Sequence, residues 1–256
     1  MGLIKQCDDH LGRILDHLEE SGEMQNTMIV LTSDHGDYMG DHWLGEKDLF
    51  HDQSAKIPMI IYDTRPEADG TRGTTCDALV ESIDMAPTFV DFAGDTPPDH
   101  ILEGRSLTPW LHGETPEWRD YVISEFDYTM TPQGKLLDVT PAQGRLFMIF
   151  DGRYKMMHAE GGFGAQLFDL ETDPNEFDDR ANDPAMADVV NDMYLKLGAW
   201  GRRSCQRVTT STPDMYAKRG KSLRRGVLPF LVDGSEVDSE LTMYLRRKPN
   251  KTYIPE

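Results

Sequence analysis

Residues 28–32 constrain the fold more than any other part of the chain, because they form an unbroken run of apolar and β-branched side chains. Such a run, without alternating polar residues, is typical of a strand buried on both faces of a parallel sheet. The run ends abruptly, and Asp34, His35 and Gly36 follow after a single serine. Ligand sites in open α/β sheets form at the carboxyl ends of strands. The sequence therefore predicts an interior strand with an acid and an imidazole at its carboxyl end.

The segments on either side of this strand carry a helix pattern and a second strand pattern. Apolar residues recur at steps of three and four over residues 4–18, and Gly22 follows as a C-terminal cap, which predicts an amphipathic helix. Residues 57–62 ("IPMIIY") resemble a second buried strand. We expect the helix to pack on the parallel sheet that these strands form.

A further helix is predicted in the segment "SIDMAPTFVDFAG". Asp84 can cap this helix, Pro87 falls in the tolerated first turn, and Gly94 ends it. The alternation of helices and strands up to residue 113 predicts the α/β fold class.

Beyond residue 113 the pattern changes to short strands split by Gly and Asp turns, with no helix between them. The strand candidates are "YVISEF", "GRLFMIFD", "RYKMMHA" and "AQLFDL", and the helix candidate "PAMADVVNDMYLKLGAW" follows them. This order predicts a small antiparallel sheet with one helix packed on it. We therefore divide the chain into an α/β part (residues 1–113), a small α+β subdomain (114–210) and an extended basic tail (211–256). The tail could be an oligomerisation arm or a disordered end.

The charge and cysteine content exclude several classes of partner. The formal net charge of −19 argues against nucleic acid or an anionic membrane as a general partner. No run reaches the roughly 18 apolar residues of a membrane span, and the first residues lack the layout of a signal peptide. We therefore expect a cytoplasmic location. The three cysteines are too widely spaced for a zinc cage or a disulfide framework.

The residues after the first strand suit binding of a cation and an anion. The Asp34 carboxylate and the His35 imidazole can share one divalent cation. Lys47 carries a point charge on a flexible stem and could reach an anionic oxygen of a substrate. The alternative is that Asp34 caps a following turn and that His35 is an ordinary polar loop residue.

The stretch "TSDHGDYMGDHWLGEK" resembles the second metal-binding motif of the sulfatases and phosphonate monoester hydrolases, in the alkaline phosphatase superfamily. Further matches are "AKIPMIIYD", "SIDMAPTFVDFAG", "EGRSLTPWL", "GRYKMMHAEG" and "LFDLETDPNE", and together they cover roughly residues 1–210. The resemblance implies the C-terminal part of an alkaline-phosphatase-like sandwich, with a small antiparallel-sheet subdomain. Residues 1–113 would then be the C-terminal part of the catalytic domain.

The resemblance also implies roles for particular residues. Asp34 and His35 would bind the divalent metal, and Lys47 would contact the sulfate or phosphate of a small ester. An oxygen ligand beside an imidazole suits Mn²⁺ better than Ca²⁺, and we expect one of these two. His42 and His51 lie in the same loop. Either could bind substrate or act as a general acid, and the alternative is a solvated loop histidine.

The chain departs from the family pattern in one respect. Family members carry a first metal-binding aspartate and a C-x-P-x-R type motif, whose cysteine or serine becomes formylglycine, and no cysteine here fits that motif. We therefore expect the chain to be the C-terminal part of such an enzyme and to be inactive alone. We also expect it to self-associate or to need an N-terminal half.

The sequence is compatible with three functions. The first is a sulfuric or phosphoric/phosphonic ester hydrolase of the sulfatase family. The second is a non-catalytic folded or interaction module derived from a sulfatase. The third is a relative of the cofactor-independent mutases, which also use Asp-His-Gly motifs, although "GRYK" and "LFDLETDPNE" argue against it.

Overall fold

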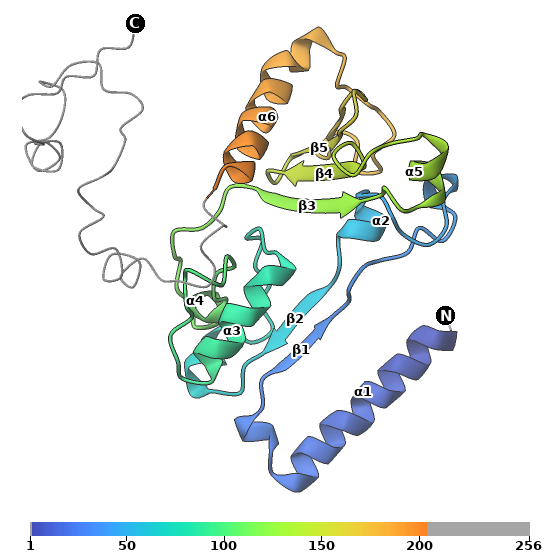
Figure 1. The fold of residues 1–256 in the computed structure, drawn as a ribbon. Helices are drawn as coiled ribbons and strands as arrows, with labels where there is room; N and C mark the ends of the chain where they lie inside the picture. The colour runs from blue at the N-terminus through green and yellow to red at the C-terminus, as the bar shows by residue number, and fades with distance from the viewer. Residues whose placement is uncertain (1, 204–256) are drawn as a thin grey trace, which may run out of the picture. The chain divides into compact units, whose positions relative to one another are not determined.

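The computed structural model describes residues 2–203, drawn in colour in Figure 1. The helices and strands are, in chain order, α1 (Gly2–Ser21), β1 (Ile29–Thr32), α2 (Asp52–Ala55), β2 (Met59–Tyr62), α3 (Met85–Phe92), α4 (Thr108–Leu111), β3 (Val122–Asp127), α5 (Pro132–Leu136), β4 (Arg145–Phe150), β5 (Tyr154–Ala159), β6 (Gln166–Asp169) and α6 (Ala187–Gly201). The tail predicted over residues 211–256 lies outside the described residues. Within residues 2–203, no helix is long and apolar enough to cross a bilayer.

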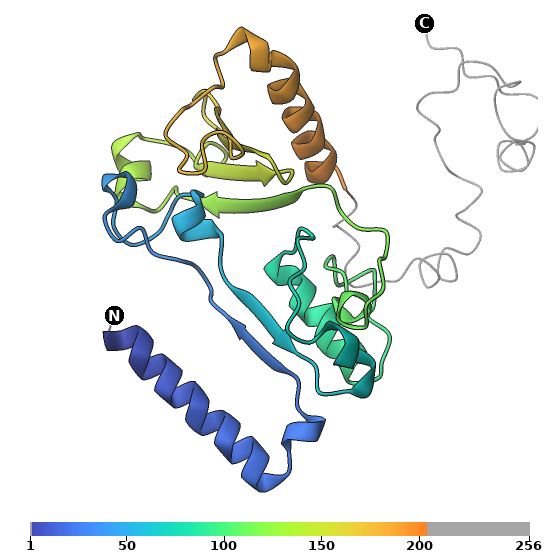
Figure 2. The ribbon, with the colours of Figure 1, turned by 180° about the vertical axis from the view of Figure 1, so that it is seen from behind.

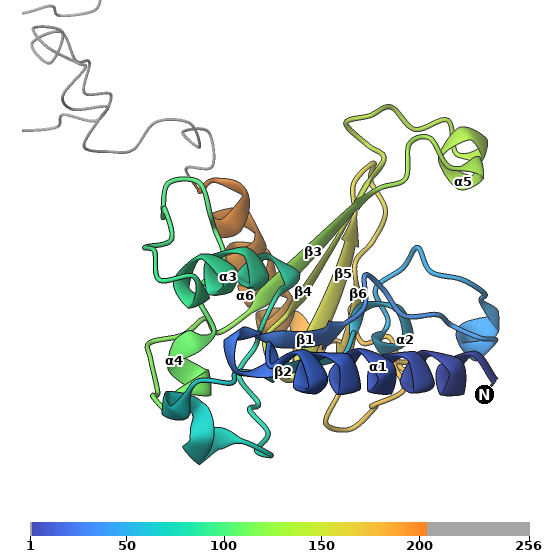
Figure 3. The same cartoon turned by 90° about the horizontal axis from the view of Figure 1, so that it is seen from below.

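The helix predicted at the start of the chain is confirmed as α1, and Gly22 follows it with a φ of +76°, the left-handed conformation of a C-cap glycine. Helix α1 runs alongside β1 and β2 (Figures 1 and 3), but none of its residues is buried. An open groove of about 370 Å³ lies between helix and strands. Its apolar lining consists mainly of Leu11, Leu15, Met24, Ile29, Leu31, Ile60 and Tyr62. The helix therefore faces the strands without packing closely on them.

The two strands predicted to be parallel neighbours are antiparallel, so that part of the prediction is wrong. Strand β1 pairs with β2 in the register Ile29↔Tyr62 to Thr32↔Met59. The reason lies in the connecting segment, which leaves and returns at the same end of the pair. The Thr32 hydroxyl donates to the Pro58 carbonyl at 2.8 Å, which joins the end of β1 to the start of β2. An apolar run indicates that a strand suits burial, but it does not indicate the direction of the neighbouring strand.

Burial of β1 on both faces was also predicted, and within the described part of the chain it is incomplete. Leu31 is 42% exposed and Ile60 is 59% exposed. Between residues 2 and 203, β1 has only β2 as a hydrogen-bonded neighbour. The strand pair thus presents apolar side chains and a free strand edge, which are features that recruit further polypeptide.

The small antiparallel sheet predicted after residue 113 is confirmed. Its strand order is β3-β4-β5-β6, and every neighbouring pair is antiparallel. Side chains alternate between the two faces of the sheet, so β4, β5 and β6 each contribute to two cores. One core contains Ile149, Met156 and Leu167 together with Met193 of α6. The boundary predicted at residue 113 itself stays a prediction.

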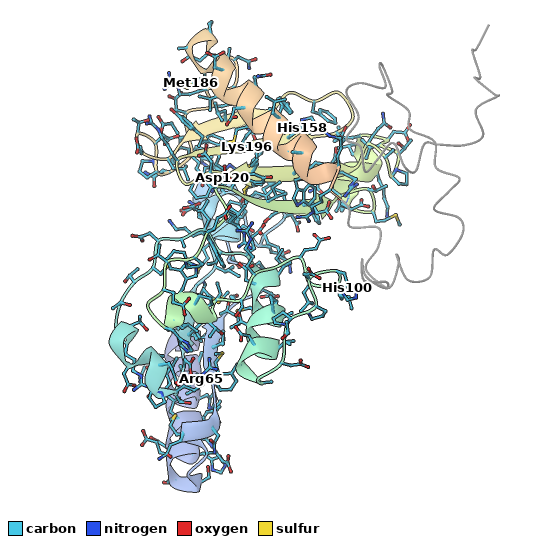
Figure 4. All side chains as sticks on the ribbon, turned by 90° about the vertical axis from the view of Figure 1, so that its left-hand side faces the viewer. Arg65, His100, Asp120, His158, Met186 and Lys196 are labelled. Carbon is cyan, nitrogen blue, oxygen red and sulfur yellow. The ribbon has the colours of Figure 1, made fainter. Side chains whose placement is uncertain are left out.

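Helix α6 covers one face of this sheet, as predicted for the last helix (Figures 1 and 2). On this side His158 of β5 lies 3.1 Å from the hydroxyl of Tyr194 (Nδ1 to Oη; His158 is labelled in Figure 4). The opposite face carries Met148, Met157 and Phe168, and Phe50 and Ala55 pack against them. The small sheet therefore supports the segment that runs from the end of β1 to β2.

The third predicted helix is confirmed as α3, but its expected cap has another role. The Asp84 side chain is fully buried and does not cap α3. It accepts hydrogen bonds from the backbone amides of Glu81 and Arg105, each at 2.8 Å, and from the guanidinium of Arg119. Asp84 thus joins α3 to the segment that leads into β3.

Candidate functional site

Asp34 and His35 lie together directly beyond the end of β1. The distance from Asp34 Oδ2 to His35 Nε2 is 3.4 Å. The Asp34 side chain is largely exposed and that of His35 about one-third exposed, so both are open to a ligand. One cation could therefore contact both side chains without a change of backbone.

The hydrogen bonds of His35 fix the tautomer of its ring. Nδ1 lies 2.7 Å from the Gly36 carbonyl oxygen, which can only accept, so Nδ1 carries the proton. The lone pair of Nε2 is then free to accept, and it accepts from the ammonium of Lys47 at 2.7 Å. A histidine that ligates a metal is usually oriented by such a bond from its other nitrogen. In this structure the Lys47 ammonium takes the place that a cation would take at Nε2.

Asp34 is held in its charged form. Its pKa lies below the usual range, first because of its own backbone amide, and then because of the electrostatic effect of the His35 ring, the amide of His35 and the charge of Lys47. The amide of His35 donates to Oδ1 at 3.1 Å. An ionised, exposed carboxylate is a hard oxygen ligand of the kind that divalent cations prefer.

Gly36 is needed for a close backbone approach. Its amide donates to the carbonyl of Ser54 at 2.8 Å. A Cβ at this position would lie 1.9 Å from the carbonyl oxygen of Gln53. The end of β1 is thereby pressed against α2, which fixes where His35 can lie.

Residues 37–50, here called the Lys47 loop, carry the lysine to the site. Tyr38 is buried in this loop, and its hydroxyl lies 2.8 Å from Nδ1 of His51, at the end of the loop. Burial raises the pKa of Tyr38 to about 12, so the phenol keeps its proton and donates it to His51. The ring of His42 stacks on His51, with centroids 4.1 Å apart.

His51 is a buried, neutral histidine. Burial above all, then the nearby His42 and Lys155, lower its pKa from 6.5 to about 4. At neutral pH it has no extra proton to donate, and Nδ1 is occupied by the Tyr38 hydroxyl. Its role as a catalytic acid stays a prediction, and so does substrate binding by His42, whose Nε2 is buried without a hydrogen-bond partner in the described part of the chain.

The burial of His51 predicts a specific pH dependence of stability. The unfolded chain binds a proton at His51 as the pH falls through 6.5, whereas the folded chain does so only near 4. The free energy of unfolding should therefore decrease as the pH falls between these values, by up to about 3 kcal/mol from this one group. Urea unfolding of the wild type and His51→Gln across this range measures the difference. Parallel pH profiles of the two proteins would contradict the assignment.

Asp34 and His35 form a pair and not a complete metal cage. Within residues 2–203, no cluster of three or more His, Cys, Asp or Glu side chains could hold a metal ion. Sequence reasoning also missed Lys155 and Glu176, which contact the segment after the Lys47 loop. Glu176 lies in the family match "LFDLETDPNE", but nothing in the sequence paired it with a lysine on a strand.

Comparison with known proteins places this geometry in a class. A family model described as "N-sulphoglucosamine sulphohydrolase, C-terminal" matches residues 40–202. The "multifunctional alkaline phosphatase superfamily protein PehA" of Trinickia caryophylli is 35% identical over 214 residues, which are 82% of this chain and 41% of that protein. An arylsulfatase of Clostridium perfringens is 34% identical over 76% of this chain and 37% of its own length.

Solved structures give the same picture. The phosphonate monoester hydrolase of Agrobacterium radiobacter is 35% identical, with a TM-score of 0.68 over 75% of this chain and 38% of that chain. The phosphonate monoester hydrolase from Silicibacter pomeroyi has a TM-score of 0.71 at 31% identity, over 79% and 40% of the two chains. These proteins are sulfatases and phosphonate monoester hydrolases, and the predicted α/β fold class is confirmed.

The fold and these comparisons thus place the chain in the sulfatase and phosphonate monoester hydrolase class, in the alkaline phosphatase superfamily. Within that class, the chain belongs to the family of the N-sulphoglucosamine sulphohydrolase C-terminal region. It spans about two-fifths of the length of the relatives it matches.

Proposed function

We propose that this chain supplies one side of the active site of a metal-dependent hydrolase of sulfate, phosphate or phosphonate esters. The observation that carries the proposal is the convergence of Asp34 Oδ2, His35 Nε2 and the Lys47 ammonium at the carboxyl end of β1. Two ligand atoms and a cationic donor at one point suit a divalent cation with an ester oxyanion beside it. The names of the relatives, which include an arylsulfatase and phosphonate monoester hydrolases, support the same class of substrate.

Each of the three residues has a separate task in this proposal. Asp34 offers an anionic oxygen, and the Nε2 lone pair of His35 would bind Mn²⁺ or Ca²⁺ in place of the Lys47 ammonium that it contacts in this structure. When bound, such a cation would supply Lewis-acid stabilisation of the negative charge on the ester oxygens. Lys47 presents three N–H donors and a full positive charge to the transferring group.

We further propose that the nucleophile comes from polypeptide equivalent to the part of the relatives that this chain does not match. The exposed apolar side chains of β1 and β2, and the groove beneath α1, provide a surface for that polypeptide. Because such apolar surface recruits further chains, self-association is expected when that polypeptide is absent. Homo-oligomerisation and a cytoplasmic location stay predictions.

The test compares this chain with a hybrid enzyme. In the hybrid, the N-terminal part of the Trinickia caryophylli protein, which this chain does not match, is joined to this chain. The chain alone should show no turnover of aryl sulfates or phosphonate monoesters with Mn²⁺. The folded hybrid should turn over at least one of these esters at about 1 s⁻¹, the lower range of typical enzymes.

The intact Trinickia caryophylli protein is the positive control, and circular dichroism verifies that the hybrid is folded. A folded hybrid without activity toward either ester would contradict the proposal. Comparable turnover by the chain alone would show that it already contains a nucleophile.

A further inference from the structure

The Lys47 loop adopts a backbone that its residues disfavour. Non-glycine residues in it take positive φ values between 48° and 100°, namely Met39, His42, Trp43, Glu46 and Asp48. L-residues rarely occupy this region, and runs of such residues persist only where surrounding structure holds them. Within the loop, hydrogen bonds from the Tyr38 amide to Glu46 and from the Gly40 amide to Leu44, each 2.9 Å, close it on itself.

The loop is also held from outside, by a segment far away in sequence. The ring of Phe177 stacks on His42 with centroids 4.6 Å apart, and it meets Trp43 edge-on at 6.3 Å. Phe177 is 62% exposed, so little else is packed against it. Its preceding residue, Glu176, is buried and has a positive φ of 58°.

Glu176 joins a buried ion cluster at the end of the loop. Its Oε2 accepts from the backbone amide of Asp52 at 2.6 Å. Its Oε1 lies 2.8 Å from the ammonium of Lys155, in an ionic contact that is not aligned as a hydrogen bond. Lys155, on β5, also binds Asp52 Oδ1 at 2.5 Å and is only 3% exposed.

The charges in this cluster reinforce one another. Burial raises the pKa of Asp52, but the hydrogen bonds and charges of Lys155 and Lys56 outweigh it, so the pKa lies below the usual range. Asp52 follows His51, whose Nδ1 accepts a hydrogen bond from the hydroxyl of Tyr38 at the start of the loop. Lys155 on β5 and Glu176 in the segment after β6 therefore hold one end of the Lys47 loop through ionic contacts, and Phe177 in the same segment holds its middle.

We infer that Glu176, Lys155 and Phe177 are positioning residues that hold the Lys47 loop, and with it the Lys47 ammonium, against His35. The reason for holding Lys47 in place rests on the proposed function, whereas the contacts that hold the loop do not depend on it. Glu176 and Lys155 touch neither Asp34 nor His35. They act through Asp52 and His51, and Phe177 acts through His42.

Hydrogen exchange of the full chain, measured by mass spectrometry, tests this inference independently of activity. Peptides that cover residues 37–50 report opening of the loop, because the Tyr38 and Gly40 amides exchange only when it opens. Glu176→Gln keeps the shape of the side chain and removes its charge. We expect it to speed exchange of these amides by about tenfold or more, with little change in β4 and α6.

The matched control is Asp169→Asn, which alters a buried carboxylate on β6. Asp169 pairs with Arg153 at 2.7 Å and makes no contact with the loop. It should leave exchange of residues 37–50 unchanged. Equal acceleration by both variants, or none by Glu176→Gln, would overturn the inference.

A second variant covers the case in which Glu176→Gln fails to fold. Phe177→Ala removes an exposed ring and its stack on His42, so it should leave the fold intact and still speed exchange of the loop. Unchanged exchange in this variant would show that the ring does not hold the loop. Ester turnover is not used, so failure here and failure of the proposed function would be separate results.

Discussion

Replacement of Lys47 by methionine in the hybrid enzyme is expected to lower kcat/KM by about 100-fold or more. Methionine keeps much of the length of the side chain and removes the charge and all three donors. The oxyanion would then lose its charge-assisted partner at the moment when its charge is greatest. The decrease in kcat/KM should be smaller for Lys47→Arg. The guanidinium keeps the positive charge, although its planar group places the N–H donors differently.

The control for this prediction is Lys135→Met, which removes an exposed lysine on α5 away from the site. It should leave kcat/KM unchanged. A loss of less than about fivefold in Lys47→Met, where one oxyanion donor typically contributes far more, would show that Lys47 does not stabilise the reacting group.

The largest effect on stability is expected from Lys155→Met. This variant removes the cation that contacts both Asp52 and Glu176, whose side chain is fully buried. A buried charge left without its partner costs about 3–5 kcal/mol, because neither water nor an opposite charge stabilises it. The free energy of unfolding, from urea titration of the full chain, should fall by that amount.

Lys196→Met is the matched control, since Lys196 also makes two carboxylate contacts, to Asp192 at 2.8 Å and Asp151 at 3.7 Å. Figure 4 labels Lys196 on α6, and its side chain is 23% exposed. Ion pairs that water reaches contribute about 0–1 kcal/mol. Equal losses in the two variants would mean that burial does not set the strength of the Lys155 cluster.

The parts of the fold that could be predicted from sequence depend on local patterns. The helical periodicity before Gly22 and the short strands after residue 113 each lie within a few residues of chain, and both predictions are confirmed. The direction of β2 relative to β1 could not be predicted from a local pattern. It depends on how the long segment between them returns to its starting point, through contacts such as the one between Thr32 and Pro58.

In the candidate site, too, local features could be predicted from the sequence and long-range contacts could not. Asp34 and His35 are adjacent in sequence and follow a strand, so their proximity could be predicted. Lys47 is a candidate because it is a flexible cation in the segment that follows them, and the family resemblance implies the same role. Glu176 contacts Asp52 across 124 positions of sequence, and Lys155 contacts the same residue across 103. No local pattern indicates such pairs, and the polar sequence around Glu176 gives no sign that its carboxylate is buried.

Binding of Mn²⁺ to the full chain, followed by the loss of the free-ion signal in electron paramagnetic resonance, shows whether the carboxylate of Asp34 and the Nε2 lone pair of His35 bind one divalent cation. The wild type and an Asp41→Asn control, which alters an exposed carboxylate in the Lys47 loop, should bind Mn²⁺ equally. The double variant Asp34→Asn/His35→Gln should bind at least about tenfold more weakly, because it lacks both the anionic oxygen and the imidazole lone pair. Equal binding of Mn²⁺ by the double variant and the wild type would show that Asp34 and His35 do not bind the cation.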